Sequence, residues 1–201
     1  KDYNMGKQGY VVVYLPKGVY RISQTLVLKG KIGVSIIGED PTNTTILWSG
    51  PDKDTMFWAN GSAYFRTSRL RWNPGTAKEM EAIGIHWKNA WNDNFSRSYA
   101  SLNIEIADCF FEYGFRFAIS GGTFQEDGTS NNDSEITIRR CTFLNVTEAA
   151  IKIRGYNALD YWIWDCRFYN CKSGVECTAG NFHAYRSYFY KSTFADFHIS
   201  M

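Results

Sequence analysis

Hydrophobic and polar positions in the second half of the chain follow one pattern that recurs several times. Apolar side chains stand at alternate positions on either side of a short polar gap: Ile136, Ile138, Cys141, Phe143, Ile151 and Ile153. Segments 163–180 and 184–199 repeat this pattern, and segment 106–120 carries a fainter copy. Because alternation with a period of two is typical of β-strands, the pattern predicts short strands and no long helix.

The spacing of the copies predicts how these strands are arranged. From Cys109 to Cys141, to Cys166 and to Ser187, the steps are 32, 25 and 21 residues. The longest step contains a polar, glycine-rich stretch, 121–134, which is typical of a loop. Two or three short strands in a repeat of a little over twenty residues, closed by polar bends, form one coil of a parallel β-helix.

Stacked coils place equivalent residues above one another, about 4.8 Å apart. The pattern therefore predicts an aromatic column in the core, formed by Phe111, Phe143, Phe168 and Phe189. It predicts a parallel aliphatic column of Ile106, Ile138, Ile163 and Ala184. The residues before the Cys/Ser positions alternate in charge and predict a surface ladder of ion pairs: Asp108, Arg140, Asp165 and Arg186.

The first half of the chain fits the same plan less regularly. Strands are expected within 10–23 and 25–39, and loops over 73–82 and 88–99. We therefore expect one all-β domain over residues 1–201, with irregular coils in 1–100 and regular coils in 101–201.

Composition and charge narrow the function classes. The net charge of +2 implies neither nucleic acid nor an acidic membrane surface as a partner. No apolar run approaches the roughly 18–20 residues that span a bilayer. Aromatic residues make up 17% of the chain. The five cysteines are odd in number and lack metal-site spacing, so they indicate buried packing rather than disulfides or a zinc site.

A family resemblance begins at the first coils. "VVYLPKGVYRISQTLVLKGKIGVSIIGE", residues 12–39, resembles the opening coils of the pectate-lyase-like superfamily. "ITIRRCTF" and "AAIKIRG", at 136–143 and 149–155, resemble the repeating coil of that superfamily. Its members include pectate lyases, polygalacturonase-like hydrolases and phage tailspike depolymerases. The resemblance therefore implies a right-handed, single-stranded parallel β-helix from a carbohydrate-active protein outside the cell or in the periplasm.

Two features depart from the family pattern. The usual N-terminal cap with its Gly-Ala-x-Gly-Asp-Gly segment is missing, and the chain reaches "FADFHISM" without a capping segment. The Asn-Thr-Asp, Gly-His-Gly and Arg-Ile-Lys signatures of polygalacturonases are also missing from the sequence. We expect the chain to be a portion of a longer β-helix.

The resemblance implies a polysaccharide groove along the strands that follow the Cys-x-Phe bend. Strand alternation points six charged or titratable side chains outward there: Arg116, Lys152, Arg154, Glu176, Asp196 and His198. Glu176 and Asp196 stand one diagonal step apart, about 7–8 Å between β-carbons. That spacing suits the acid and base of an inverting glycoside hydrolase, with His198 beside them and an acidic sugar held by Arg116, Lys152 and Arg154.

Other readings of this face stay open. In a polysaccharide lyase, Lys152 or Arg154 is the base and Arg116 neutralises the uronate, with calcium as a possible cofactor; otherwise no cofactor is expected. The same charges also suit a purely structural ladder. Hydrolysis ranks ahead of elimination, and the competing class is a non-catalytic carbohydrate-binding or structural β-helix, as in an adhesin or a tailspike.

Tryptophans supply the last sequence signal. Trp87 and Trp91 border a predicted loop beside the candidate face and are expected to contact sugar. Trp162 and Trp164 alternate with Tyr161 and Ile163 and are expected to face outward on a different sheet. An interface between subunits, or cover from a flanking loop, suits these two rings. The expected partner is a polysaccharide, and an acidic one would suit the basic side chains of the candidate face.

Overall fold

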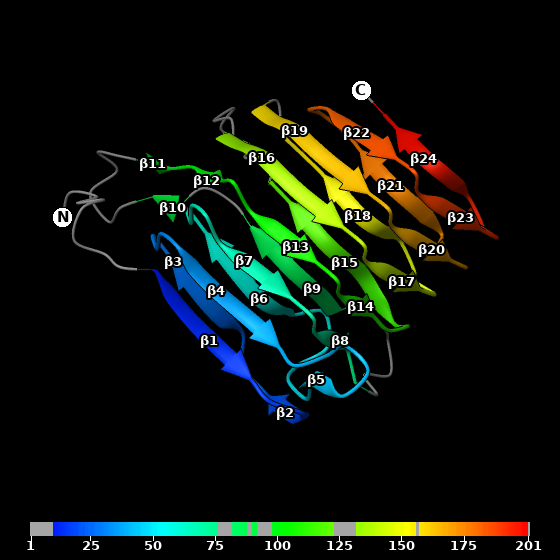
Figure 1. Cartoon of the computed structure of the whole chain (residues 1–201). Helices are drawn as coiled ribbons and strands as arrows, with labels where there is room; N and C mark the ends of the chain where they lie inside the picture. The colour runs from blue at the N-terminus through cyan, green and yellow to red at the C-terminus, as the bar shows by residue number, and fades with distance from the viewer. Residues whose placement is uncertain are drawn as a thin grey trace.

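The computed structural model describes residues 10–75, 82–87, 90–91, 98–122, 132–155 and 157–200. Three parallel sheets run along the molecule, and the chain passes from one to the next in turn (Figure 1). Sheet A contains β1 (Val11–Leu15), β4 (Val34–Gly38), β7 (Arg66–Ser68), β13 (Glu105–Ala107), β16 (Asn132–Arg139), β19 (Asn157–Trp164) and β22 (Phe182–Tyr185). A further short strand, β12 (Ser101–Leu102), pairs with β16.

The other two sheets repeat this order. Sheet B contains β2 (Gly18–Ile22), β5 (Thr44–Trp48), β8 (Arg71–Asn73), β14 (Phe110–Phe111), β17 (Thr142–Leu144), β20 (Arg167–Tyr169) and β23 (Tyr188–Tyr190). Sheet C contains β3 (Leu26–Lys29), β6 (Thr55–Asn60), β9 (Ala82–Trp87), β15 (Phe115–Gly121), β18 (Ala149–Ile153), β21 (Ser173–Cys177) and β24 (Ala195–Ile199). The described residues contain strands and no helix, which confirms the predicted parallel β-helix.

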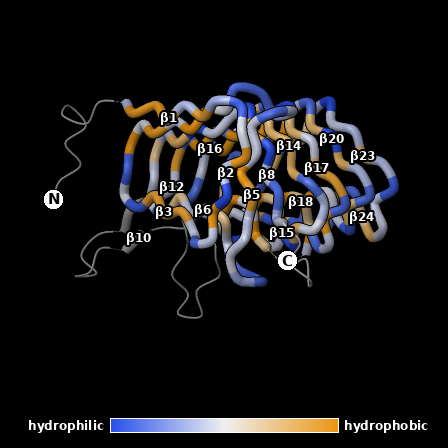
Figure 2. Tube along the Cα trace, turned by 90° about the horizontal axis from the view of Figure 1, so that it is seen from below, coloured by the Kyte–Doolittle hydropathy of each residue, from blue (hydrophilic) through white to orange (hydrophobic). Residues whose placement is uncertain are grey.

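Both predicted core columns are confirmed. Ring centroids lie 5.1 Å apart for Phe111 and Phe143, 4.9 Å for Phe143 and Phe168, and 4.5 Å for Phe168 and Phe189. Trp72 continues the column one coil earlier, stacked 6.4 Å from Phe111. Figure 2 shows the corresponding hydrophobic stretches recurring in successive coils. Since one coil alone leaves these rings exposed, stacking is what buries them.

The aliphatic column and the charge ladder follow from the same register. Ile138 lies between Ile106 and Ile163 across paired strands, and Ile163 pairs onward with Ala184. At the bend between sheets A and B, the guanidinium of Arg140 donates to Asp108 at 2.6 and 2.7 Å. Arg186 donates to Asp165 in the same way, at 2.9 and 3.0 Å. The predicted ladder is therefore present as two ion pairs.

The first half of the chain contributes three coils to the same sheets, β1–β3, β4–β6 and β7–β9. Most of the loop predicted over 88–99 lies outside the described residues; within it, β10 (Ala90–Trp91) pairs antiparallel with β11 (Ser98–Tyr99). All five cysteines are buried free thiols. In the described part of the chain, no helix has the length and apolarity needed to cross a membrane, and no cluster of His, Cys, Asp and Glu is placed to hold a metal.

Candidate functional site

The outer face of sheet C carries the groove residues that the sequence analysis selected. Register aligns Ser120, Lys152, Glu176 and His198 on successive coils. The Lys152 ammonium forms an ion pair with Glu176, and Lys152 as a whole is buried, with 8% of its surface exposed. His198 Nδ1 lies 3.7 Å from the same Glu176 carboxylate oxygen. The structure therefore brings Lys152, Glu176 and His198 together as one row.

Arg116 and Arg154 lie beside this row around one ring. Their guanidinium carbons stand 5.1 and 5.2 Å from the ring centroid of Phe117. Arg154 also donates to the Ser120 hydroxyl at 3.1 Å. Burial, and then the positive charge of Arg116, lower the pKa of Arg154. Sequence reasoning missed Phe117 and Ser120, because an irregularity between Phe115 and Phe117 interrupts simple alternation in β15.

The two proposed catalytic carboxylates have separate partners. Glu176 lies opposite His198, so Asp196 is the diagonal neighbour that the alternation predicted. The Glu176 carboxylate, however, faces Lys152, whereas Asp196 accepts a hydrogen bond from Ser192 at 2.6 Å within its own coil. An acid–base function for this pair stays a prediction.

The expected sugar contact at Trp87 needs correction. Its ring is fully buried, and its indole N–H donates to the Tyr161 hydroxyl at 3.0 Å and to Asp133 at 3.2 Å. No ring surface is left for a sugar, because Trp87 lies at the inward-facing end of β9 rather than on the loop beyond it. The side chain of Trp91 lies outside the described residues.

Asp133 is a buried carboxyl group in a hydrogen-bonded cluster of the core. The Tyr161 hydroxyl and the Trp87 indole both donate to its Oδ2, while its Oδ1 has no hydrogen-bond partner among the described residues. Burial raises the pKa of Asp133 to about 7, against the opposing effect of these two hydrogen bonds. Gly121 leaves room for the cluster, since a β-carbon there would fall 2.1 Å from the Tyr161 hydroxyl oxygen.

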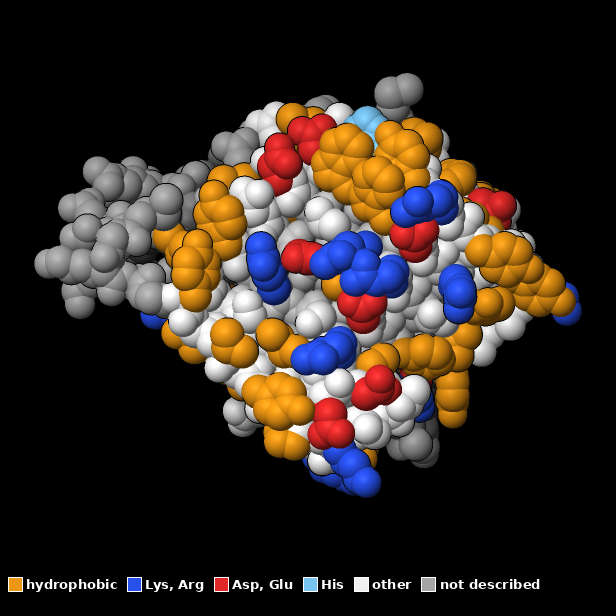
Figure 3. All heavy atoms as spheres, in the orientation of Figure 1, with side chains coloured by type: hydrophobic (Ala, Val, Ile, Leu, Met, Phe, Trp, Pro, Cys, Tyr) orange, Lys and Arg blue, Asp and Glu red, His pale blue; other side chains and the backbone are white. Residues whose placement is uncertain are grey.

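The outer face of sheet A carries a stack of aromatic side chains that we call the aromatic platform: Trp162, Trp164, His183 and Tyr185. Register places Trp162 opposite His183 and Trp164 opposite Tyr185. The ring centroids lie 4.3 Å and 4.4 Å apart, nearly parallel. The prediction that both tryptophans face outward on a different sheet is confirmed, and Figure 3 shows hydrophobic side chains gathered on this face with a histidine beside them.

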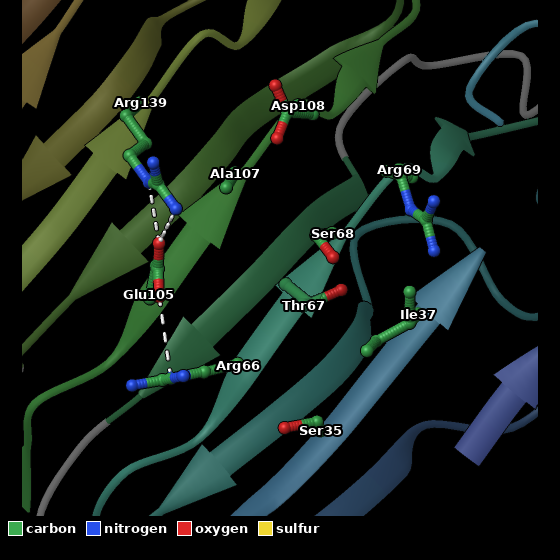
Figure 4. Close-up of a pocket in the computed structure, with 10 residues that line it drawn as sticks. All are labelled: Ser35, Ile37, Arg66, Thr67, Ser68, Arg69, Glu105, Ala107, Asp108 and Arg139. Carbon is green, nitrogen blue, oxygen red and sulfur yellow. Dashed lines mark hydrogen bonds and ion pairs between the residues drawn. The ribbon is translucent and has the colours of Figure 1, made fainter. Parts of the chain in front are cut away.

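A hollow of about 340 Å³ lies on the same face, over β4, β7 and β13. We call it the arginine hollow, because Arg66, Arg69 and Arg139 line it (Figure 4). The Glu105 carboxylate lies between two of them, 2.5 Å from Arg139 Nη2 and 3.4 Å from Arg66 Nε. Sequence reasoning missed this site, although the outward positions of the sheet A strands held the signal.

Comparison with known proteins concerns the fold alone. No family model matches the chain, and no curated protein matches it in sequence. The solved structure of Geobacillus virus E2 ORF18 is similar at a TM-score of 0.34 and 13% identity, over 93% of this chain and 51% of that one. The Streptococcus pneumoniae surface protein and adhesin PfbA is similar at 0.44 and 16%, over 84% of this chain and 63% of that one. The chain therefore spans between half and two thirds of these structures.

Proposed function

We propose that this chain is a carbohydrate-binding module of a β-helical protein, and that it binds a glycan on the outer face of sheet A without cleaving it. The observation that carries the proposal is the aromatic platform. The rings stack on one another across the two coils, and the ring surface that remains exposed forms a rigid apolar surface that suits contact with a sugar. Exposed aromatic clusters of this kind mark binding sites rather than ordinary surface.

Binding is favoured over hydrolysis by the condition of sheet C. A general acid and a general base need access to the scissile bond and freedom to exchange protons. Here Glu176 is occupied by Lys152, and Asp196 by Ser192. The row resembles the alternating ion pairs of the Asp108 ladder, which are structural. The outer face of sheet A offers exposed ring surface instead.

The proposal also covers the partner of the protein and its location. The resemblance of the first coils to the pectate-lyase-like superfamily supports a polysaccharide partner. A glycan-binding β-helix of this kind acts at a cell or virion surface, so we place the protein outside the cell or in the periplasm.

A glycan array followed by calorimetry tests the proposal. The probes are neutral and acidic oligosaccharides, and the variant is Trp164→Ala, which removes one ring of the platform. We expect at least a tenfold loss of affinity for the bound oligosaccharide, since stacked aromatic anchors dominate such contacts. Tyr188→Ala is the matched control, because Tyr188 is an exposed ring on sheet B and its loss should leave affinity unchanged.

Four results would contradict the proposal. The first is that no oligosaccharide on the array binds, and the second is that Trp164→Ala binds as tightly as the wild type. The third is that the wild type self-associates and Trp164→Ala abolishes this, which would make the platform a protein interface. The fourth is that a bound oligosaccharide is cleaved and that the double variant Glu176→Gln, Asp196→Asn loses this cleavage, which would support a glycoside hydrolase instead.

A further inference from the structure

We propose that the arginine hollow binds an anionic group, a carboxylate or a sulfate, of the same glycan whose sugar ring lies on the aromatic platform. This inference rests on the proposed function and adds the ligand class: an acidic glycan. The shape of the hollow, its charge and its continuity with the platform support it.

The hollow exists because small side chains interrupt the outer rows of sheet A. In one row, Ser68 and Ala107 stand between Ile37 and Arg139 on successive coils. In the neighbouring row, Ser35 precedes Arg66 and Glu105. Short side chains at the floor with long arginines at the rim leave a depression whose walls present guanidinium groups, as Figure 4 shows.

Cations exceed anions in this depression. Three arginines line it together with two carboxylates, Glu105 and Asp108. Asp108 is already neutralised by Arg140 outside the hollow, at 2.6 Å. Glu105 is shared between Arg66 and Arg139, so this group of three keeps a positive charge. An incoming anion therefore meets an excess of positive charge.

Arg69 is the residue best placed to bind that anion. Its guanidinium makes no ion pair and no side-chain hydrogen bond with the residues that the structure describes, and its charge acts on Asp40 only as a weak influence. A guanidinium matches the two oxygens of a carboxylate or a sulfate with parallel hydrogen bonds. Arg66 and Arg139, held in place by Glu105, supply fixed donors on the other side.

The hollow and the platform form one continuous surface. Arg139 and Trp164 are partners in register on adjacent coils, so they lie about 4.8 Å apart along the helix. Figure 3 shows the basic and acidic side chains across the middle of the same face that carries the hydrophobic cluster. Arg69 follows Ser68, which lies three coils before Trp164, about 14 Å along the helix, so an oligosaccharide of several sugars can place a ring on Trp164 and a charged substituent against Arg69.

Calorimetry at fixed ionic strength tests the inference with a uronic-acid oligosaccharide and its carboxyl-reduced counterpart. We expect the acidic form to bind the wild type about tenfold more tightly. Arg69→Gln should remove that advantage and leave affinity for the reduced form unchanged. Lys172→Gln is the control: it removes the same charge from a pair with Glu148 on another part of the surface, and should keep the advantage.

The outcomes separate this inference from the proposed function. Equal affinity for both forms, with a loss only in Trp164→Ala, would overturn the anion site and leave the platform intact. A charge advantage lost in Arg69→Gln, with no effect of Trp164→Ala, would support the anion site and overturn the platform. If neither oligosaccharide binds, binding of inorganic sulfate is measured instead. Saturable binding of sulfate to the wild type that Arg69→Gln loses would support the anion site, and any other result would refute it.

Discussion

At the scale of single residues, Asp133 shows how a buried polar group constrains the fold. Its carboxyl is fully buried, and donors from Tyr161 and Trp87 converge on one of its oxygens. Burial of a charged carboxylate is unfavourable, which is why its pKa is raised to about 7. A carboxyl whose folded pKa lies above its unfolded value stabilises the fold at low pH and loses that contribution as the pH rises.

Asp133→Asn should therefore flatten the pH dependence of stability. In the wild type, the contribution of Asp133 is complete below its unfolded pKa of 3.8 and falls as the pH rises to about 7. The limiting slope from one such group is about 1.4 kcal/mol per pH unit. The amide keeps an oxygen acceptor and cannot ionise. Urea unfolding of both proteins from pH 4 to 8 measures the difference, which should grow with pH in favour of the variant.

A constant difference in stability between the two proteins across that range would contradict this account, because it would mean that the pKa of Asp133 is the same in the folded and unfolded states. Tyr161→Phe offers a second check. Without the Tyr161 hydroxyl, the carboxylate loses a hydrogen bond that lowers its pKa, so the decline in stability should begin at least as steeply and extend to higher pH.

At the scale of elements, the stacked coils make each core ring depend on the coils above and below it. Phe143 is fully buried and has a stacked ring on both sides, at 5.1 and 4.9 Å. Phe189 stacks on Phe168 and is half-buried in the 201-residue chain. The same substitution should therefore cost different amounts along one column.

Phe143→Ala should lower the free energy of unfolding by about 3–5 kcal/mol, the usual cost of removing a buried aromatic ring. Phe189→Ala should cost clearly less, since its ring contacts the core on one side. Phe194, which is 63% exposed, gives a surface control that should change stability by less than about 0.5 kcal/mol. Equal costs at Phe143 and Phe189 in urea unfolding would contradict the stacked column.

The sequence predicts these columns because they depend only on the spacing of the repeat. Phe111, Phe143 and Phe168 share a position in each copy, so their contact follows once the coils stack. The outer faces are harder to predict. Trp87 borders a predicted loop in the sequence, yet it is the last residue of β9 and its side chain is buried in the core. The arginine hollow depends on small residues from three successive coils, Ser35, Ser68 and Ala107, which no single copy displays.

At the scale of the whole molecule, the β-helix presents two outer faces of different character. On sheet C, charged side chains pair with one another, as Lys152 does with Glu176. On sheet A, the aromatic platform and the arginine hollow together combine ring surface with an excess of positive charge. We propose that the glycan binds on sheet A; the alternative is a ligand on sheet C.

Indole N–H signals of the seven tryptophans, followed by nitrogen-15 NMR during titration with an acidic oligosaccharide, test that assignment most directly. The account predicts that the signals of Trp162 and Trp164 shift, while those of the buried Trp72 and Trp87 stay in place. Trp58 on sheet C is partly exposed and in register with His86, so it reports on the other face. A shift at Trp58 with Trp162 and Trp164 unchanged would contradict the account.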